Sequence, residues 1–445
     1  MLNYGMLRTL TGIMTATTKR VPIPAKGVDY RGTVVLAPMV RSGECPSRLL
    51  ALKYGADLVW GPETIDKAMI GTTKHFNPKT QTIDFTRMPS NKVYDPDANE
   101  SVIYRLDPER ESKKLIYQIG TSNPETAVEA SKLVAEHVAG IDVNAGCPKP
   151  FSTSGGMGAA LLRTPDKLCS ILEALVKEVG NPFEIGISVK IRLLETPEMT
   201  KDLVTRLCAT GITGLTIHCR TTPMRPRERA IREQLRMITE TCHEAGVACL
   251  MNGDVTSRDE ALQLANEYGA DGGMIATAAE TNPSCFRAEK DGGKAPWEEV
   301  VAEYMRICLE VENRFGNTKY LLGQMIPGKS PNYRSMNQSK SYADLVRVLE
   351  MEQELGERAK EVDQQLGIGK PPMSKAEKKA KNKAMLAKMA EEKDKMKADG
   401  ETQDAVKTSL KRTADEAALD NMPADVARKE GPGSVTDHNA SILAV

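Results

Sequence analysis

The feature that most constrains the fold is an alternation, repeated eight times between Val34 and Ala276, of a short apolar run with an amphipathic stretch. The runs are rich in Val, Ile and Leu and do not alternate with polar residues, as expected for parallel strands buried on both faces. Eight such units, over close to the ~250 residues typical of the fold, predict a (β/α)8 TIM barrel of the α/β class. We expect its strands at residues 34–36, 57–60, 115–119, 140–143, 185–191, 214–218, 247–251 and 272–275.

A weak internal repeat supports this prediction. The segments Tyr54-Gly55-Ala56-Asp57 and Tyr268-Gly269-Ala270-Asp271 each place a glycine immediately before an expected strand, and Thr210-Gly211-Ile212 is similar. Glycine is favoured where a helix ends in a left-handed residue. Each of these segments is therefore interpreted as the end of a helix that leads into a strand.

Composition divides the chain around the barrel. A long polar connection with several prolines predicts an insertion after the second strand, and helical periodicity at Trp297–Phe315 and Ser341–Leu366 predicts a small helical domain. Hydrophobicity then collapses beyond Pro372. We expect a flexible or transit-like N-terminus at 1–28, a barrel at 29–286 with its insertion at 64–114, a helical domain at 287–368 and a disordered lysine-rich tail at 369–445.

Charge and cysteine content narrow the class of protein. Sixty basic residues balance sixty acidic ones, so a nucleic-acid binder would have to gather its positive charge on one face. The nine cysteines form no Cys-x-x-Cys pair and no zinc spacing, which predicts free thiols in a reducing compartment and no metal site. No apolar run approaches the ~20 residues of a membrane-spanning helix, so we expect no contact with a membrane.

Both termini leave alternatives open. Residues 1–28 carry four basic residues and no acid, which fits either a mitochondrial transit peptide or an irregular N-terminus; we otherwise expect a cytoplasmic or nuclear protein. Residues 375–397 hold nine lysines against four acids. This stretch is either a solvated tail or a basic arm that contacts RNA phosphates.

The residues suited to chemistry lie at the ends of the expected strands, where a TIM barrel builds its active site. Lys190 can hold negative charge near N1 and O2 of a reduced flavin ring, and Gln118 can hydrogen-bond its pyrimidine edge. Backbone N–H groups after the last two strands can take a phosphate. The ends of seven strands carry such groups: Pro38-Met39-Val40, Gln118, Asn144-Ala145-Gly146-Cys147-Pro148, Lys190, His218-Cys219-Arg220, Asn252-Gly253-Asp254 and Ala276-Thr277.

Three motifs resemble the dihydrouridine synthase family. They are Ala37-Pro38-Met39-Val40, the strand at 140–143 leading into Asn144-Ala145-Gly146-Cys147-Pro148, and Gly155-Gly156-Met157-Gly158-Ala159-Ala160-Leu161-Leu162. The resemblance runs from about Val34 to Phe286. It is strongest to the eukaryotic branch that modifies uridine 20 of the tRNA D-loop, which also resembles this chain around Thr318-Lys319-Tyr320.

The resemblance implies an NADPH-dependent, FMN-containing oxidoreductase that binds tRNA, which we expect to be monomeric. It implies that Cys147 is the proton donor when the C5–C6 bond of a uridine is reduced. Thr277 departs from the family, which usually has an arginine near the FMN phosphate, and it leaves the phosphate to backbone amides and a hydroxyl. The expected FMN contacts are Pro38, Met39, Val40, Gln118, Lys190, His218, Asn252, Gly253, Asp254, Ala276 and Thr277.

Substrate contacts are expected around the same strand ends. A stacked nucleobase cannot reach a barrel mouth, so the tRNA must give up its base at a cost of a few kcal/mol. Asn144 is a candidate contact to that base. Arg220, Arg225, Arg227 and Arg229 follow the sixth strand and either hold neighbouring phosphates or form a solvated helix start.

Two other functions remain open at this point. A dihydroorotate- or dihydropyrimidine-type oxidoreductase would also use FMN and a strand-end acid or base on a pyrimidine, but it would act on the free molecule. A non-catalytic RNA-binding protein could keep the barrel without the flavin, an alternative opened by Thr277. A flavin spectrum and activity on tRNA distinguish these functions.

Overall fold

The computed structural model describes residues 21–88, 100–225 and 227–369, together with Ala380, Lys383, Ala384 and Ala387. The predictions for residues 1–20 and for most of the chain from 370 onward fall outside these residues.

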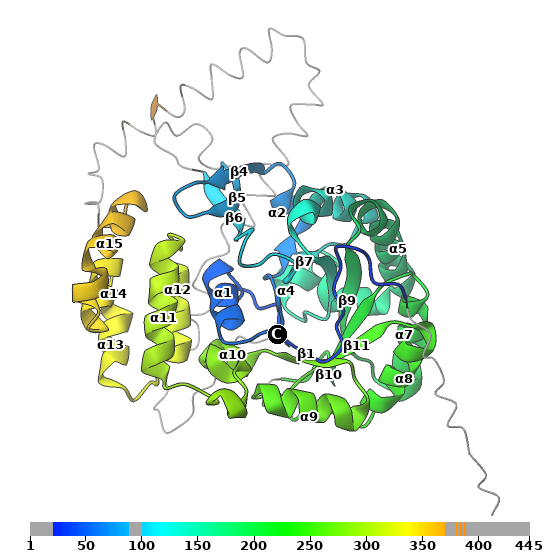
Figure 1. The fold of residues 1–445 in the computed structure, drawn as a ribbon. Coiled ribbons are helices and arrows are strands. Elements are labelled where there is room, and N and C mark those ends of the chain that lie inside the picture. The colour runs from blue at the N-terminus through cyan, green and yellow to red at the C-terminus, as the bar shows by residue number, and fades with distance from the viewer. Residues whose placement is uncertain are drawn as a thin grey trace, which may run out of the picture.

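A closed parallel barrel of eight strands forms the centre of the molecule (Figure 1). The strands are hydrogen-bonded in the order β2-β1-β12-β11-β10-β9-β8-β7, and pairing of β2 with β7 closes the ring. Almost every strand residue is buried, which explains the unbroken apolar runs and confirms the predicted fold class. The strands are β1 (Thr33–Leu36), β2 (Leu58–Trp60), β7 (Leu115–Gly120), β8 (Gly140–Ala145), β9 (Gly186–Leu193), β10 (Gly214–Thr221), β11 (Ala248–Asn252) and β12 (Gly272–Ile275).

Helices between the strands surround the barrel (Figure 1). Asn123, Thr196 and Ser257 cap three of them by accepting a hydrogen bond from a backbone N–H of the first turn. Gly55 and Gly269 both have positive φ angles after a helix, as the internal repeat predicted. The helices are α1 (Cys45–Lys53), α3 (Pro124–Val134), α4 (Pro150–Thr153), α5 (Pro165–Leu175), α6 (Asn181–Phe183), α7 (Pro197–Cys208), α8 (Leu235–Ala245), α9 (Arg258–Tyr268) and α10 (Thr277–Thr281).

The insertion after β2 contains regular structure. Its first strand, β3 (Thr64–Ile65), pairs with β7 and is followed by α2 (Asp66–Met69). A three-stranded antiparallel sheet then forms from β4 (Thr73–Asn77), β5 (Thr82–Arg87) and β6 (Ser101–Leu106). A buried ion pair between Arg48 of α1 and Glu111, with Nε and Oε1 2.5 Å apart, ties the insertion to the barrel.

Within residues 287–369, five helices follow the barrel and stack beside it (Figure 1). α11 packs against α1, and α12 packs against α10, so this region adjoins the strand ends as well as the barrel wall. Helix formation is confirmed, whereas the proposed boundary at 286/287 stays a prediction. The helices are α11 (Trp297–Glu310), α12 (Phe315–Met325), α13 (Pro331–Gln338), α14 (Tyr342–Val348) and α15 (Glu352–Gln365).

Sequence periodicity described this helical region only in part. The periodicity did not separate α12 and α13, and the helical stretch at Ser341–Leu366 is divided into two helices near Glu350, which has a φ of 58°. Gly316 and Gly323 weaken the signal of α12, and α13 is short and polar.

Three further features of the sequence analysis concern thiols, metal ions and membranes. All nine cysteines are free. Within the described ranges, no cluster of His, Cys, Asp and Glu could hold a metal ion. In the same part of the chain, no helix is both long enough and apolar enough to cross a membrane.

Candidate active site

Strand register brings the predicted polar residues to one end of the barrel. Gln118 lies beside Asp142, and Asn144 lies beside Lys190. His218 lies beside Asn252. Alternate residues of a strand share a face. The side chains at alternate positions of β8, β9 and β10 therefore form a polar layer at the carboxyl ends of the strands.

Asp142 organises the lower part of this layer. Its carboxylate accepts a hydrogen bond of 2.8 Å from Nε2 of Gln118 and one of 2.7 Å from Oγ of Ser188. Complete burial raises the pKa of Asp142 to about 6, although these hydrogen bonds and the charge of Lys190 oppose the shift. Because Asp142 holds the amide nitrogen of Gln118, the amide oxygen remains to accept a hydrogen bond from a ligand.

Lys190 supplies a buried positive charge above Asp142. Burial, reinforced by Arg192, lowers the pKa of Lys190 to about 8. Its ammonium makes no hydrogen bond or ion pair within the described part of the chain. A buried cation without a partner destabilises the protein unless an anion binds beside it.

His218 presents a neutral imidazole to the same region. Burial and the charges of Lys190, Arg192 and Arg220 hold its pKa well below the usual range. Nε2 lies 3.2 Å from Nη1 of Arg220, which can only donate, so Nε2 accepts and Nδ1 carries the proton. Nδ1 is buried and has no partner among the described residues. It is therefore an available donor.

The loop after β8 holds Cys147 in a fixed position. The side-chain oxygen of Asn144 accepts hydrogen bonds of 3.0 Å from the backbone N–H groups of Gly146 and Cys147. Burial, followed by the negative charge of Glu63, raises the pKa of the Cys147 thiol, which keeps it protonated. Asn144 thus shapes the loop, and its predicted contact with substrate stays a prediction.

Glu63, which the sequence interpretation missed, lies beside this loop. It follows β2, the one strand whose end had been assigned no functional residue. Oγ of Ser152 donates a 3.0 Å hydrogen bond to Oε1 of Glu63, whereas Oε2 is buried without a partner in the described residues. An acidic residue in the short segment after a barrel strand was the available signal.

The remaining predicted cofactor residues lie at the ends of β1, β11 and β12. Pro38 and Met39 are buried, and Val40 is half-buried. Nδ2 of Asn252 donates to the backbone oxygen of Met274 over 2.9 Å. Gly253 has a φ of 123°, which favours glycine. Ala276 is half-buried at the last of these strand ends.

Thr277, which the resemblance marked as a departure from the family, is exposed at the first residue of α10. Arg232 brings a cation to the neighbouring loop, where its Nη2 donates over 2.9 Å to the backbone oxygens of Gly253 and Asp254. The sequence interpretation did not include Arg232.

The arginines after β10 separate into two groups. Arg220 is buried, pairs with Asp254 and donates to the backbone oxygen of Glu228 over 2.7 Å. Its guanidinium supports His218 and Asp254, so this geometry does not favour the predicted contact with substrate. Arg225, Arg227 and Arg229 are exposed, as a phosphate contact requires.

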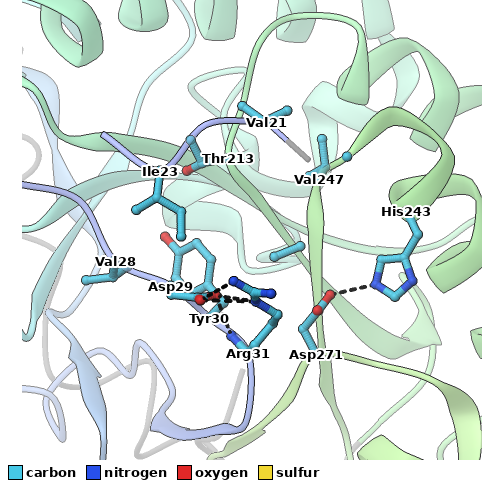
Figure 2. A pocket seen from close by; sticks show the side chains of 12 residues that line it. Val21, Ile23, Val28, Asp29, Tyr30, Arg31, Thr213, His243, Val247 and Asp271 are labelled. Carbon is cyan, nitrogen blue, oxygen red and sulfur yellow. Dashed lines mark hydrogen bonds and ion pairs between the residues drawn. The ribbon is translucent and has the colours of Figure 1, made fainter. Parts of the chain in front are cut away.

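A separate pocket lies at the opposite end of the barrel (Figure 2). It is lined by residues that precede or begin strands, among them Tyr30, Thr213, Val247 and Asp271. Asp271 accepts a hydrogen bond of 2.8 Å from the backbone N–H of Cys249, and its carboxylate lies 2.8 Å from Nε2 of His243. These bonds tie strand starts together, and residues at this end of a TIM barrel serve stability.

Together, the fold and site define an α/β-barrel enzyme with polar groups and a protonated thiol at its mouth. The family model for dihydrouridine synthases matches residues 35–366. The chain belongs to the dihydrouridine synthase family.

Two curated relatives are similar over most of the chain. The tRNA-dihydrouridine(20) synthase (NAD(P)+) of Schizosaccharomyces pombe is 50% identical over 330 residues, which is 73% of this chain and 66% of that protein. The Saccharomyces cerevisiae protein of the same name is 46% identical over 329 residues, covering 72% of this chain and 84% of that protein. A human tRNA-dihydrouridine(20a/20b) synthase (NAD(P)+)-like protein is 28% identical over 270 residues, covering 60% of this chain and 74% of that protein.

Proposed function

We propose that this protein is an FMN-dependent tRNA-dihydrouridine synthase that reduces the C5–C6 bond of uridine 20 in the tRNA D-loop, with NADPH as the source of hydride. The observation that carries the proposal is the placement of the Cys147 thiol at the barrel mouth that also presents Lys190 and His218.

The residues present fit a flavin. Among the described residues, the buried ammonium of Lys190 makes no hydrogen bond or ion pair and Nδ1 of His218 has no acceptor, whereas the oxygen of Gln118 is left to accept. These are the groups that the O2, N1 and N3 edge of an isoalloxazine ring requires. FMN would therefore rest on Gln118, Lys190 and His218, with its phosphate near Gly253 and Thr277.

When bound, FMN supplies the hydride that C6 of the uracil ring accepts. The residues of the protein supply the proton, stabilise negative charge and hold the thiol in position. Cys147 donates its thiol proton to C5, which is why a raised thiol pKa is useful here. Lys190 provides positive charge in a partly dry site, where it stabilises negative charge more strongly than in water. Asn144 fixes the position from which the thiol donates.

The substrate assignment rests on the relatives. The names of the S. pombe and S. cerevisiae relatives both specify position 20 and NAD(P)+. The exposed arginines Arg225 and Arg227 supply charge for tRNA phosphates after β10. We propose contacts with the flipped base from the loop that holds Cys147.

The test uses purified full-length protein, FMN, NADPH and tRNA isolated from cells that lack dihydrouridine at position 20. The expected results are a flavin absorption spectrum and a new dihydrouridine at position 20 alone, mapped by mass spectrometry. Oxidation of dihydroorotate or reduction of free uracil without any change in tRNA would instead identify a free-pyrimidine oxidoreductase. A protein that binds tRNA but carries no flavin would be an RNA-binding barrel.

A further inference from the structure

The carboxyl group of Glu63 forms part of the surroundings of Cys147. Its Oε1 accepts a hydrogen bond of 3.0 Å from Oγ of Ser152, and the side chains of Asn144 and Cys147 lie close enough to lower its pKa. The side-chain oxygen of Asn144 also accepts a hydrogen bond of 3.0 Å from the backbone N–H of Cys147. The carboxyl therefore lies beside the loop that holds the thiol, and each of the two groups affects the pKa of the other.

Two glycines make room for this group. A Cβ atom on Gly120 would lie 2.5 Å from Oε1 of Glu63 and 3.1 Å from its Cδ. A Cβ atom on Gly158 would meet Oγ of Ser152 and would lie 2.6 Å from the backbone oxygen of Cys147, and φ at Gly158 is 56°. Side chains at either position would displace the carboxyl or its hydrogen-bond donor. The backbone is shaped to accept Glu63 beside the thiol.

Glu63 has no basic partner among the described residues. Its Oε2 is buried and makes no hydrogen bond to any of them. Burial raises the pKa of Glu63 to about 7, and no lysine or arginine in that part of the chain opposes the shift. At neutral pH the carboxyl therefore holds a proton much of the time, and a protonated carboxyl is a hydrogen donor.

Other charges reach the thiol from different elements. Glu63 faces Cys147 from the loop after β2, Lys149 from the thiol's own loop and Arg192 from β9. Arg192 uses Nε to donate to the backbone oxygen of Gly146 over 2.8 Å. Among the titratable groups of the described chain, Cys147 alone shifts the pKa of Glu63.

We propose that Glu63 returns a proton to Cys147 after each reduction and so resets the thiol. This inference rests on the proposed function. When the thiol protonates C5, the S–H bond breaks, the new C–H bond forms and the electron pair stays on sulfur. The O–H bond of Glu63 then breaks as S–H reforms, and the carboxylate takes its next proton from water. Without this transfer a thiolate would remain buried, which is costly.

Glu63 acts through Cys147 and is thus a positioning residue for the thiol. The first test measures the pH dependence of alkylation of Cys147 by iodoacetamide in the full-length holoprotein. Peptide mass spectrometry separates Cys147 from the other eight cysteines. In Glu63→Gln the alkylation midpoint should fall by about one pH unit, because the negative charge beside the thiolate is gone.

The matched control is Ser152→Ala, which removes the hydrogen bond to Oε1 of Glu63 and keeps the carboxyl group. Its midpoint should lie closer to that of the wild type than to that of Glu63→Gln. The flavin spectrum and the melting temperature of each variant show whether it is folded. An unchanged midpoint in folded Glu63→Gln would overturn the coupling.

The second test compares first and later turnovers on tRNA. A pre-reduced Glu63→Gln enzyme should complete its first turnover at close to the wild-type rate, since its thiol is already protonated. Its steady-state kcat should fall about tenfold, somewhat less than is typical for lost proton transfer. We expect the wild-type kcat to decline above pH 7 as Glu63 loses its proton, and the variant should lack this decline. If kcat depended on pH in the same way in the wild type and in Glu63→Gln, the proposed proton transfer from Glu63 to Cys147 would be overturned.

The two tests separate this inference from the proposed function. A shifted alkylation midpoint in a protein that reduces no tRNA would support the pairing of Glu63 with Cys147 and overturn the proposed function. An unchanged midpoint in a protein that does reduce tRNA would overturn the inference alone.

Discussion

Gln118 and Asp142 are joined across two neighbouring barrel strands by a hydrogen bond of 2.8 Å from the amide Nε2 to the carboxylate Oδ2. This contact decides which end of the amide faces the mouth. A carboxylate accepts only, so the amide must turn its N–H group inward and its oxygen outward. The buried charge of Asp142 therefore sets the hydrogen-bonding character of a residue that we assign to the flavin.

Replacing Asp142 with asparagine should weaken FMN binding. The new side-chain amide would present an N–H group to either Gln118 or Ser188, both of which donate to this position, and the Gln118 amide would turn or shift. An unmatched buried polar group costs roughly 1–3 kcal/mol. Titration of apoprotein with FMN, followed by flavin fluorescence, measures the loss.

Ser188→Ala is the control for that substitution, because it removes one donor to Asp142 and leaves the bond from Gln118 in place. Its affinity for FMN should fall less. Equal FMN affinity in Asp142→Asn and the wild type would mean that Gln118 does not contact the flavin.

Cys147→Ala should keep its fold and its FMN but lose most turnover, because only protonation at C5 is removed. A loss of roughly 10²–10⁴-fold is expected for a general acid. Reduction of the flavin by NADPH, observed as bleaching in a stopped-flow instrument, should remain close to the wild type.

Cys169→Ala provides a comparison, since Cys169 is a partly exposed cysteine on the outer helix α5. That variant should turn over normally. Full activity in Cys147→Ala would leave Cys147 as a buried structural residue.

Stability should depend on pH through Glu63. Its folded pKa, raised by burial to about 7, lies above its ordinary value of 4.5, so the folded state binds this proton more tightly. The resulting stability is complete below about pH 4.5 and is lost as pH rises through 7. Glu63→Gln has no such proton to lose.

The free energy of unfolding in urea, measured at pH 5 and pH 8, tests this. Relative to the wild type, Glu63→Gln should gain stability as pH rises, by about 3 kcal/mol at most. A difference that stays constant between the two pH values would mean that Glu63 is ionised at both.

Thr277→Arg should tighten FMN binding. Thr277 is exposed at the start of α10, and a charge-assisted bond to phosphate contributes roughly 1.5–3 kcal/mol. Arg232→Ala should weaken binding if that guanidinium already serves the phosphate from the loop of Gly253. Isothermal titration of the apoproteins with FMN and with riboflavin separates the contribution of the phosphate to binding, because riboflavin has no phosphate. Equal effects on both ligands would contradict the assignment.

The sequence was sufficient to predict the barrel and most of the polar residues at the carboxyl ends of its strands. Buried strands leave unbroken apolar runs, and Gln118, Lys190 and His218 stand at their ends. The sheet of the insertion was missed because most of β4 is exposed and polar, which leaves no hydrophobic period.

The sequence did not reveal the surroundings of two residues at the site, for different reasons. Glu63 acquires its surroundings from Gly120 and Ser152, which are distant in sequence, so its position after β2 was the one local signal. Arg220 was predictable: it lies two residues after His218 on β10, and a period of two places both on the inner face of the strand.

The loop after β10 provides the last prediction. Arg225 and Arg227 are exposed, whereas Arg220 is buried, so a charge reversal at the first two changes the surface without disturbing His218. Arg225→Glu combined with Arg227→Glu should raise KM for tRNA and leave kcat and the flavin spectrum nearly unchanged. Loss of two phosphate contacts should make the slope of log Kd against log salt shallower by roughly 1.5–2.

The matched control is Lys26→Glu combined with Lys177→Glu, which makes the same change of charge at the opposite end of the barrel. If tRNA seats on the mouth, this control should alter binding far less, and the difference between the two double variants should shrink as salt screens exposed charges beyond about 10 Å. Equal losses in both would show that net charge alone attracts tRNA. No loss in Arg225→Glu with Arg227→Glu would mean that these arginines are only solvated residues of the segment between β10 and α8.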